Sequence, residues 1–183
     1  KLLALFALII LGIAIGWKED TLAANFRNAW DATTTIVNAD GSLSIVSLAG
    51  FALLGAMGAT IINSLFSADA WNNVTFIAGE IKSPRKNIPR SLFLGTFIVT
   101  VLYILANVAY LALLPLKGNP AAMDVAGQGI QFATNDRVGA SAASMIFGNT
   151  ALYIMAGLIM ISTFGCNNGL ILSGARVYYA MAK

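Results

Sequence analysis

One acidic residue that follows a long apolar stretch constrains this chain more than any other feature. Apolar and small residues run from about Ser47 to Leu65, and Asp69 comes a few positions later, at about mid-depth of a bilayer. A carboxylate without a partner at that depth is costly. Interrupted helices are tolerated there where their backbone groups line a cavity or bind a ligand. We therefore expect a helix that breaks near residues 66–70 and resumes at Trp71.

The composition is that of a membrane protein. Of 183 residues, 58% are hydrophobic and 10% charged, with a mean hydropathy of +0.77, whereas soluble domains have roughly a quarter charged residues. The net charge of +3 gathers beside hydrophobic spans, as orientation signals do, which argues against a nucleic-acid partner. With no histidine and one cysteine, Cys166, we expect no metal and no cofactor. The usual catalytic constellations are missing, so we do not expect an enzyme.

Four membrane spans are expected, and one of them is broken. They cover about 1–17, 44–81, 91–115 and 149–175. The first apolar run is only about 23 Å long as a helix, short of the bilayer core of about 30 Å. A signal-peptide core is the alternative, but the charged edge that follows favours a span cut at its start, with Lys1 inside the membrane. We therefore expect a piece of a longer protein, whose remaining spans complete the bundle.

The connecting segments divide by charge. The short loop 82–90 holds four basic residues in nine, which marks the cytoplasmic side; they are Lys82, Arg85, Lys86 and Arg90. Segments 18–43 and 116–148 hold six of the eight acids, so we expect them outside. The first suggests a short amphipathic helix around Thr21 to Trp30, and the second suggests short helices that cap the bundle. For the basic loop we favour a topology signal without a ligand, and we expect Glu80 to pair with this loop near Lys82 or Arg85.

Polar groups crowd around the expected break and in the last span. Half-helices that end near Phe66 and begin near Trp71 would present free carbonyls to a cation and free N–H groups to an anion, and a zwitterion carries both charges. Aromatic packing between helices is the alternative for these two side chains. For Asp69 we favour a helix cap over substrate contact. Ser162 and Thr163 would coordinate an ion or an ammonium, or else bond a neighbouring helix.

Together these motifs resemble the amino acid–polyamine–organocation superfamily, especially its L-type amino acid transporters and bacterial amino acid exchangers. Phe66-Ser67-Ala68-Asp69-Ala70-Trp71-Asn72 is similar to the family's F-A-Y-D/G-G-W-N, and residues 84–89 are similar to its N-P-x-x-N-L-P. Residues 1–5, 99–110 and 162–176 also look like family segments. The resemblance covers nearly the whole chain. It implies an all-α membrane protein that holds the fifth to eighth of twelve spans in a leucine-transporter-like inverted-repeat bundle, with the sixth span discontinuous.

The resemblance also assigns roles to residues. Phe66 becomes the aromatic gate, and the surrounding residues hold the amine and form the side-chain pocket; they are Ser67, Ala68, Asp69, Ala70, Trp71 and Asn72. Lys1 matches a lysine whose ammonium stands near the sodium position of sodium-coupled relatives, facing Ser162 or Thr163, which implies sodium-independent transport. Two departures from the family pattern, an alanine for an aromatic at 68 and an alanine for a glycine at 70, affect side-chain selectivity and the opening of the helix.

The function implied by this resemblance is secondary transport or exchange of neutral amino acids by alternating access. The chain would be a multi-pass protein of the plasma membrane, or of the inner membrane of a bacterial cell, with an amino acid and the lipid bilayer as partners. A membrane receptor that binds an amino acid without moving it is the alternative, and a structural subunit with a degenerate pocket is a third hypothesis. The sequence does not specify the amino acid, any proton coupling, or whether a single-span accessory chain accompanies the protein.

Overall fold

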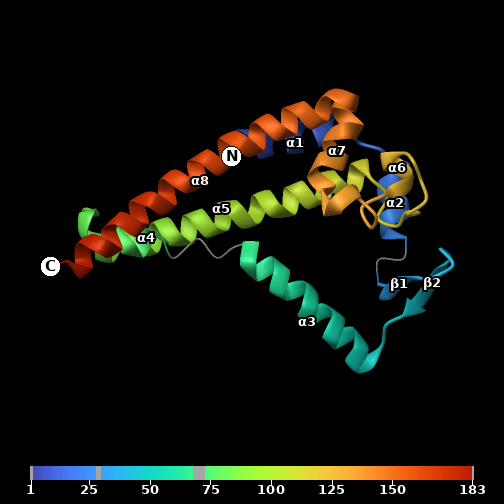
Figure 1. Cartoon of the computed structure of the whole chain (residues 1–183), viewed down its shortest axis with the longest axis horizontal. Helices are drawn as coiled ribbons and strands as arrows, with labels where there is room; N and C mark the ends of the chain where they lie inside the picture. Colours follow the sequence, from blue (N-terminus) through green and yellow to red (C-terminus); the bar gives the residue numbers. More distant parts are fainter. Residues whose placement is uncertain (1, 28–29, 68–72, 183) are drawn as a thin grey trace. The chain divides into compact units, whose positions relative to one another are not determined.

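The computed structural model describes residues 2–27, 30–67 and 73–182, and the chain is mostly helical, as expected (Figure 1). It divides into two compact units, with residues 1–25 and 73–183 in unit 1 and residues 26–72 in unit 2. Unit 1 contains α1 (Leu2–Ala14), most of α2 (Glu19–Phe26), α4 (Asn73–Phe76), η2 (Ala78–Glu80), α5 (Pro84–Leu113), α6 (Val125–Gln128), η3 (Thr134–Asp136), α7 (Val138–Phe147), η4 (Gly148–Thr150) and α8 (Ala151–Met181). Unit 2 contains β1 (Thr33–Val37), β2 (Leu43–Ser47) and α3 (Gly50–Ser67).

Unit 2 begins with a β-hairpin that the all-α expectation missed. β1 and β2 pair antiparallel over five residue pairs. Asp40 closes the turn, because its carboxylate accepts hydrogen bonds from the Ser42 amide at 2.9 Å and the Ser42 hydroxyl at 2.6 Å. These two bonds, the hydroxyl bond first, lower the pKa of the Asp40 carboxyl. Gly41 adopts φ +81°, a conformation that suits glycine.

The helix of unit 2 starts later than expected. We placed the start of the broken span near Ser44, but residues 43–47 form β2, and α3 begins at Gly50. The β-branched residues in β1 and β2, which read TTTIV and LSIVS, favour strands. Gly50 has φ +56°, which separates the strand from the helix. Within α3 the Thr60 hydroxyl donates to the carbonyls of Ala56 at 3.1 Å and Met57 at 2.9 Å, so this polar side chain is satisfied inside its own helix.

In unit 1, α1 and α5 pack closely near the end of α5 at Leu113. Gly12 in α1 and Gly16 just beyond it allow this approach, because a Cβ atom on Gly12 would lie 3.2 Å from Ala109 Cβ, and one on Gly16 would overlap Leu113. The spacing is that of the small-xxx-small pattern of membrane helix pairs. Sequence analysis did not single out these two glycines. Van der Waals contacts between the glycine backbone of this region and the side chains of Ala109 and Leu113 therefore hold α1 against α5.

Tyr110 of α5 joins the buried parts of unit 1. Three apolar clusters form the core, and Tyr110 packs against all three; their buried members are Leu8, Ala143 and Ala151, then Ile9, Leu102 and Ala106, then Leu113, Leu114 and Ala142. These members come from α1, α5, α7, the first residue of α8 and the residue after α5. The phenol oxygen lies next to α7, at 3.4 Å from where a Cβ on Gly139 would stand. One aromatic side chain thus packs against all three clusters of this core.

The segment after α5 turns back to place α7 over the end of α5. The Ile130 amide donates to the Pro115 carbonyl at 2.8 Å, and the Asn119 amide donates to the Gly127 carbonyl at 2.8 Å. Gly129 has φ +63° and passes so close to this backbone that a Cβ would lie 2.7 Å from the Pro115 carbonyl oxygen. Glycine is required there on both counts. We predicted short helices in this segment, and α6 and α7 are such helices.

The long helices agree only in part with the expected spans. Among the described residues, Pro84–Leu113 and Val138–Met181 are long and apolar enough to cross a membrane by length and composition, and Leu5–Ala14 and Gly50–Ile62 are shorter apolar helices. The predicted spans 91–115 and 149–175 fall largely inside the two long helices. The predicted loop 82–90 was wrong in form, because α5 already begins at Pro84. Proline suits that first helical position, where no N–H donor is needed.

Candidate functional site

The expected break lies between two helices of the described chain. α3 is helical through Phe66 and Ser67, and the next described residue is Asn73, at the start of α4. The other predicted substrate residues lie outside the described residues: Ala68, Asp69, Ala70, Trp71 and Asn72. The last carbonyls of any α-helix lack partners within the helix. The break and its ligand contacts therefore stay predictions, with Phe66 and Ser67 in the last turn of α3.

The second half of the predicted broken span is shorter than we expected. We expected the helical pattern to continue to about Ile81, but α4 covers four residues and is followed by the 3₁₀ turn η2. The β-branched residues of this segment and Gly79 have low helix propensity, which accounts for the irregular path. Glu80 ends η2 two residues before Lys82. This short, irregular connector leads directly into α5.

The predicted ammonium site is represented in the described residues only by its α8 partners. Ser162 is half-buried in α8, and the Thr163 hydroxyl donates to the Ile159 carbonyl at 2.9 Å. A hydroxyl that donates its one proton in this way keeps its oxygen lone pairs for a cation. Lys1 lies outside the described residues, so its predicted pairing with α8 stays a prediction. No group of three or more metal-binding side chains occurs in the part of the chain that is described.

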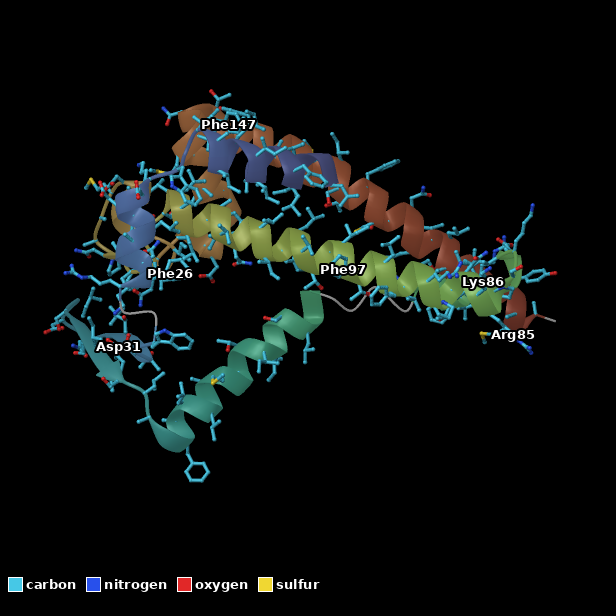
Figure 2. All side chains as sticks on the ribbon, turned by 180° about the vertical axis from the view of Figure 1, so that it is seen from behind. Phe26, Asp31, Arg85, Lys86, Phe97 and Phe147 are labelled. Carbon is cyan, nitrogen blue, oxygen red and sulfur yellow. The ribbon has the colours of Figure 1, made fainter. Side chains whose placement is uncertain are left out.

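The four predicted cytoplasmic-loop residues, which we call the basic cluster, are all exposed: Lys82, Arg85, Lys86 and Arg90. The last three lie in the first two turns of α5 rather than in a loop. Asn87 fixes the start of the helix, because its side-chain amide donates to the Lys82 carbonyl at 2.6 Å. Figure 2 shows Arg85 and Lys86 at one end of α5, with Phe97 farther along it.

Glu80 forms an ion pair that sequence reasoning placed wrongly. We expected Glu80 to pair with Lys82 or Arg85 next to it, but its carboxylate pairs with the guanidinium of Arg176 on α8. The two side chains are 52% and 38% exposed, respectively. Nearly a hundred residues separate them in sequence, so no local signal points to this pair. The pair joins the connector before α5 to the far end of α8, which α4 also contacts.

Asn25 is a second residue that sequence reasoning missed. Its side-chain amide donates to the carbonyls of Leu111 at 2.8 Å and Leu114 at 2.9 Å, and its oxygen accepts from the Leu116 amide at 2.7 Å. An α-helix ends with carbonyls that have no partner in the helix. Asn25 supplies two of these partners from α2 and thereby caps the end of α5 from a distant part of the chain.

A cavity of about 430 Å³ lies between α6, α7, η4 and the start of α8. Its lining combines the Asp124 carboxylate and polar groups of Ser144 and Asn149 with apolar side chains such as Met145 and Leu152. The Asp124 carboxylate is already used to cap α6, because it accepts from the Gly127 amide at 3.0 Å.

Comparison with known proteins identifies the family to which this helical chain belongs. The family model for amino acid permeases matches residues 1–183, so the chain belongs to the amino acid permease family. This confirms the family resemblance that the motifs indicated. The chain is 36% identical over 126 residues to the serine/threonine exchanger SteT of Bacillus subtilis, a match that covers 69% of the chain and 26% of that protein.

Two mammalian relatives extend the comparison. The human large neutral amino acids transporter small subunit 2 is 26% identical over 187 residues, which covers all of the chain and 29% of that protein. The mouse b(0,+)-type amino acid transporter 1 is 24% identical over 163 residues, which covers 87% of the chain and 26% of that protein. The chain thus spans between a quarter and a third of the length of these relatives. All three are named as transporters or exchangers and none as an enzyme, as the sequence predicted. No solved structure gives a significant match.

Proposed function

We propose that this chain is part of a sodium-independent secondary transporter or exchanger of neutral amino acids in the plasma membrane. The family match over all residues carries this proposal. The names of two relatives, a serine/threonine exchanger and a transporter of large neutral amino acids, support a neutral substrate. The name "small subunit" belongs to the mammalian relative. By analogy, a second, accessory chain is a candidate partner for the full-length protein.

In this proposal, four spans of the chain contribute to a leucine-transporter-like bundle that alternates between outward and inward openings. The end of unit 1 where α5 begins, which we call the Arg85 end, carries the basic cluster. It faces the cytoplasm in this proposal, in keeping with the preference of basic residues for that side. Segments 18–43 and 116–148 then lie outside. The substrate zwitterion binds where the span opens near residues 66–70, with the backbone carbonyls at its amine.

The test of transport is counterflow of labelled amino acids in proteoliposomes that contain the full-length protein. Serine, threonine and leucine are compared as counter-substrates, with sodium or choline as the cation. Saturable accumulation that is equal in both salts supports sodium-independent exchange. Saturable binding without any counterflow would instead favour a receptor, and the absence of both would favour a structural subunit.

Phe66 is the residue that we propose as the aromatic gate over the substrate. Truncating an aromatic side chain that packs on a ligand removes a large apolar contact, so Phe66→Ala should slow exchange by at least roughly tenfold. Phe76→Ala, which removes an exposed aromatic from the connector, is the control. Exchange at the wild-type rate in a folded Phe66→Ala protein would remove this side chain from the mechanism.

Lys1 is the residue that we propose as the substitute for a bound sodium ion. Its ammonium would supply the positive charge next to Ser162 and Thr163 that sodium supplies in sodium-coupled proteins. Lys1→Ala in the full-length protein should therefore lower the exchange rate or change the apparent substrate affinity differently on the two faces. Unaltered rate and affinity on both faces would leave Lys1 with a structural role.

A further inference from the structure

We infer that one face of α5 binds an anionic phospholipid, with the headgroup on Lys86 and Arg90 and an acyl chain along Phe93 and Phe97. This inference rests on the proposed membrane placement of α5. It goes beyond transport because it assigns a lipid to residues that are not among those proposed for substrate binding. The face is defined by these four residues, and we call it the lipid stripe.

The spacing of the four residues places them in one line along the helix. Positions 86, 90, 93 and 97 follow steps of four, three and four, and at 3.6 residues per turn they stay within an arc of about 60°. The line extends about 17 Å along the axis at 1.5 Å per residue. The two cations stand at the start of α5, and the two aromatic side chains follow on the side of the apolar span. A phospholipid has the same order of charge and hydrocarbon.

The lipid stripe lies on the side of α5 that unit 1 leaves uncovered. The packed positions of α5, at 102, 106, 109 and 113, fall on the opposite side by the same helical count. Phe93 is 74% exposed and Phe97 is 57% exposed. Their rings stack with centroids 6.3 Å apart and planes 13° apart, which gives a flat apolar surface rather than two separate side chains. Figure 2 shows Lys86 and Phe97 along the same helix.

Among the described residues, no acid is paired with either cation of the lipid stripe. Glu80 is the only acid between residues 73 and 123 in the sequence. Its carboxylate is paired with Arg176 on α8. Within residues 2–27, 30–67 and 73–182, no member of the basic cluster forms an ion pair. An anionic headgroup is the complementary partner, because basic residues next to a span attract acidic lipids by about 1 kcal/mol each, and this attraction falls off within a Debye length.

The test measures lipid binding by the purified full-length protein and does not depend on transport. Phosphatidylglycerol and phosphatidylcholine of equal chain length are titrated in detergent, and bound lipid is counted by native mass spectrometry. The wild-type protein should prefer phosphatidylglycerol. Lys86→Gln with Arg90→Gln should weaken that binding by roughly thirtyfold, which corresponds to about 2 kcal/mol for two basic residues.

The matched control removes the same charge from the same end of the helix. Lys82→Gln with Arg85→Gln leaves the lipid stripe intact, because Arg85 points about 100° away from Lys86 on the helix and Lys82 precedes it. This variant should keep most of the preference. Equal losses in both double variants would mean that total charge, and not the lipid stripe, determines binding, which would overturn the inference. No loss in either variant would overturn it as well.

The aromatic half of the lipid stripe needs a separate variant. Phe93→Ala with Phe97→Ala should weaken binding of long-chain phosphatidylglycerol severalfold and weaken binding of a six-carbon analogue less. Phe93 lies only about 4.5 Å beyond Arg90 along the axis, so the shorter chain covers only part of the stacked rings. Equal binding of the long-chain lipid by this variant and by wild type would overturn the assignment of an acyl chain to Phe93 and Phe97. Exchange activity, measured in parallel, separates a failure of the transport proposal from a failure of this one.

Discussion

The two ends of unit 1 are held together by different interactions. At the Leu113 end, α1, α5 and α7 share buried apolar clusters around Tyr110, and Asn25 caps the last carbonyls of α5. At the Arg85 end, an ion pair between two partly exposed side chains, Glu80 and Arg176, links the connector before α5 to α8. Buried packing and satisfied carbonyls are costly to disrupt, whereas exposed ion pairs contribute about 0–1 kcal/mol.

This difference fits the proposed alternating access. A rocking mechanism needs one region that keeps its packing and another that separates. The comparison predicts that substitutions at the Leu113 end will lower the stability of the protein. Substitutions at the Arg85 end should leave stability nearly unchanged and alter the balance between conformations.

The largest effect is expected at the closest contact of the Leu113 end. Gly16→Leu places a side chain into the space that Leu113 fills, and overpacking of this kind costs about 1–3 kcal/mol. The apparent melting temperature of the full-length protein in detergent should fall by a few degrees. Gly95→Leu on α5, where a Cβ meets open space, is the control. A melting temperature equal to that of the control would mean that α1 and α5 are not tightly packed.

A smaller loss of stability is expected from Asn25→Ala. The change leaves two carbonyls and one amide of the α5 end without their partner. These bonds are only partly buried, so water replaces some of them and the cost should be about 0.5–1.5 kcal/mol. Asn107→Ala is a matched comparison, because that amide donates to the Tyr103 carbonyl within its own helix at 2.8 Å. The melting temperature should fall more for the variant at position 25. If both variants melt alike, the cross-element cap contributes little.

The smallest effect on stability, with a distinct effect on transport, is expected at the Arg85 end. Arg176→Glu removes the ion pair and sets two acids side by side, and the melting temperature should stay within a degree or two because the pair is exposed. In the proposed mechanism, the Glu80–Arg176 pair stabilises the conformation that is closed on the cytoplasmic side. Loss of up to about 1 kcal/mol from that conformation should raise the inward-open population by roughly twofold to fivefold. The ratio of apparent affinities on the two faces of oriented proteoliposomes reports this shift. The double reversal Glu80→Arg with Arg176→Glu should restore the ratio, and a double variant no better than either single one would argue against a direct pair.

The sequence predicted the features that depend on local pattern. Apolar runs indicated α1, α5 and α8, and the motif around Phe66 indicated the family that the comparison confirmed. It did not predict the hairpin, because both strands are short. β1 lies in a segment that we interpreted mainly by charge, and β2 lies where we expected the broken span to begin. The helical start of α5 was missed because Pro84 was interpreted as a loop residue, although proline is common at the first helical position.

The contacts that distinguish the two ends could not be predicted from one sequence. Asn25 meets Leu114 across 89 positions, and Glu80 meets Arg176 across 96. Such pairs depend on how the helices come together, and neither residue lies in a local motif that would mark it. The glycine pair at 12 and 16 did carry a sequence signal, the spacing of closely packed membrane helices, which we did not use.

The position of Tyr110 has a consequence for how the protein is made. Leu8 leaves the ribosome about 100 residues before Tyr110, the side chain that closes the apolar clusters around α1. At translation rates of about 5–20 residues per second, roughly 5–20 s pass between the synthesis of Leu8 and that of Tyr110. During that interval its apolar surface meets lipid or the insertion machinery instead. Biogenesis of this segment should therefore depend on the lipid or the insertion machinery that covers the apolar surface of α1 until α5 has been synthesised.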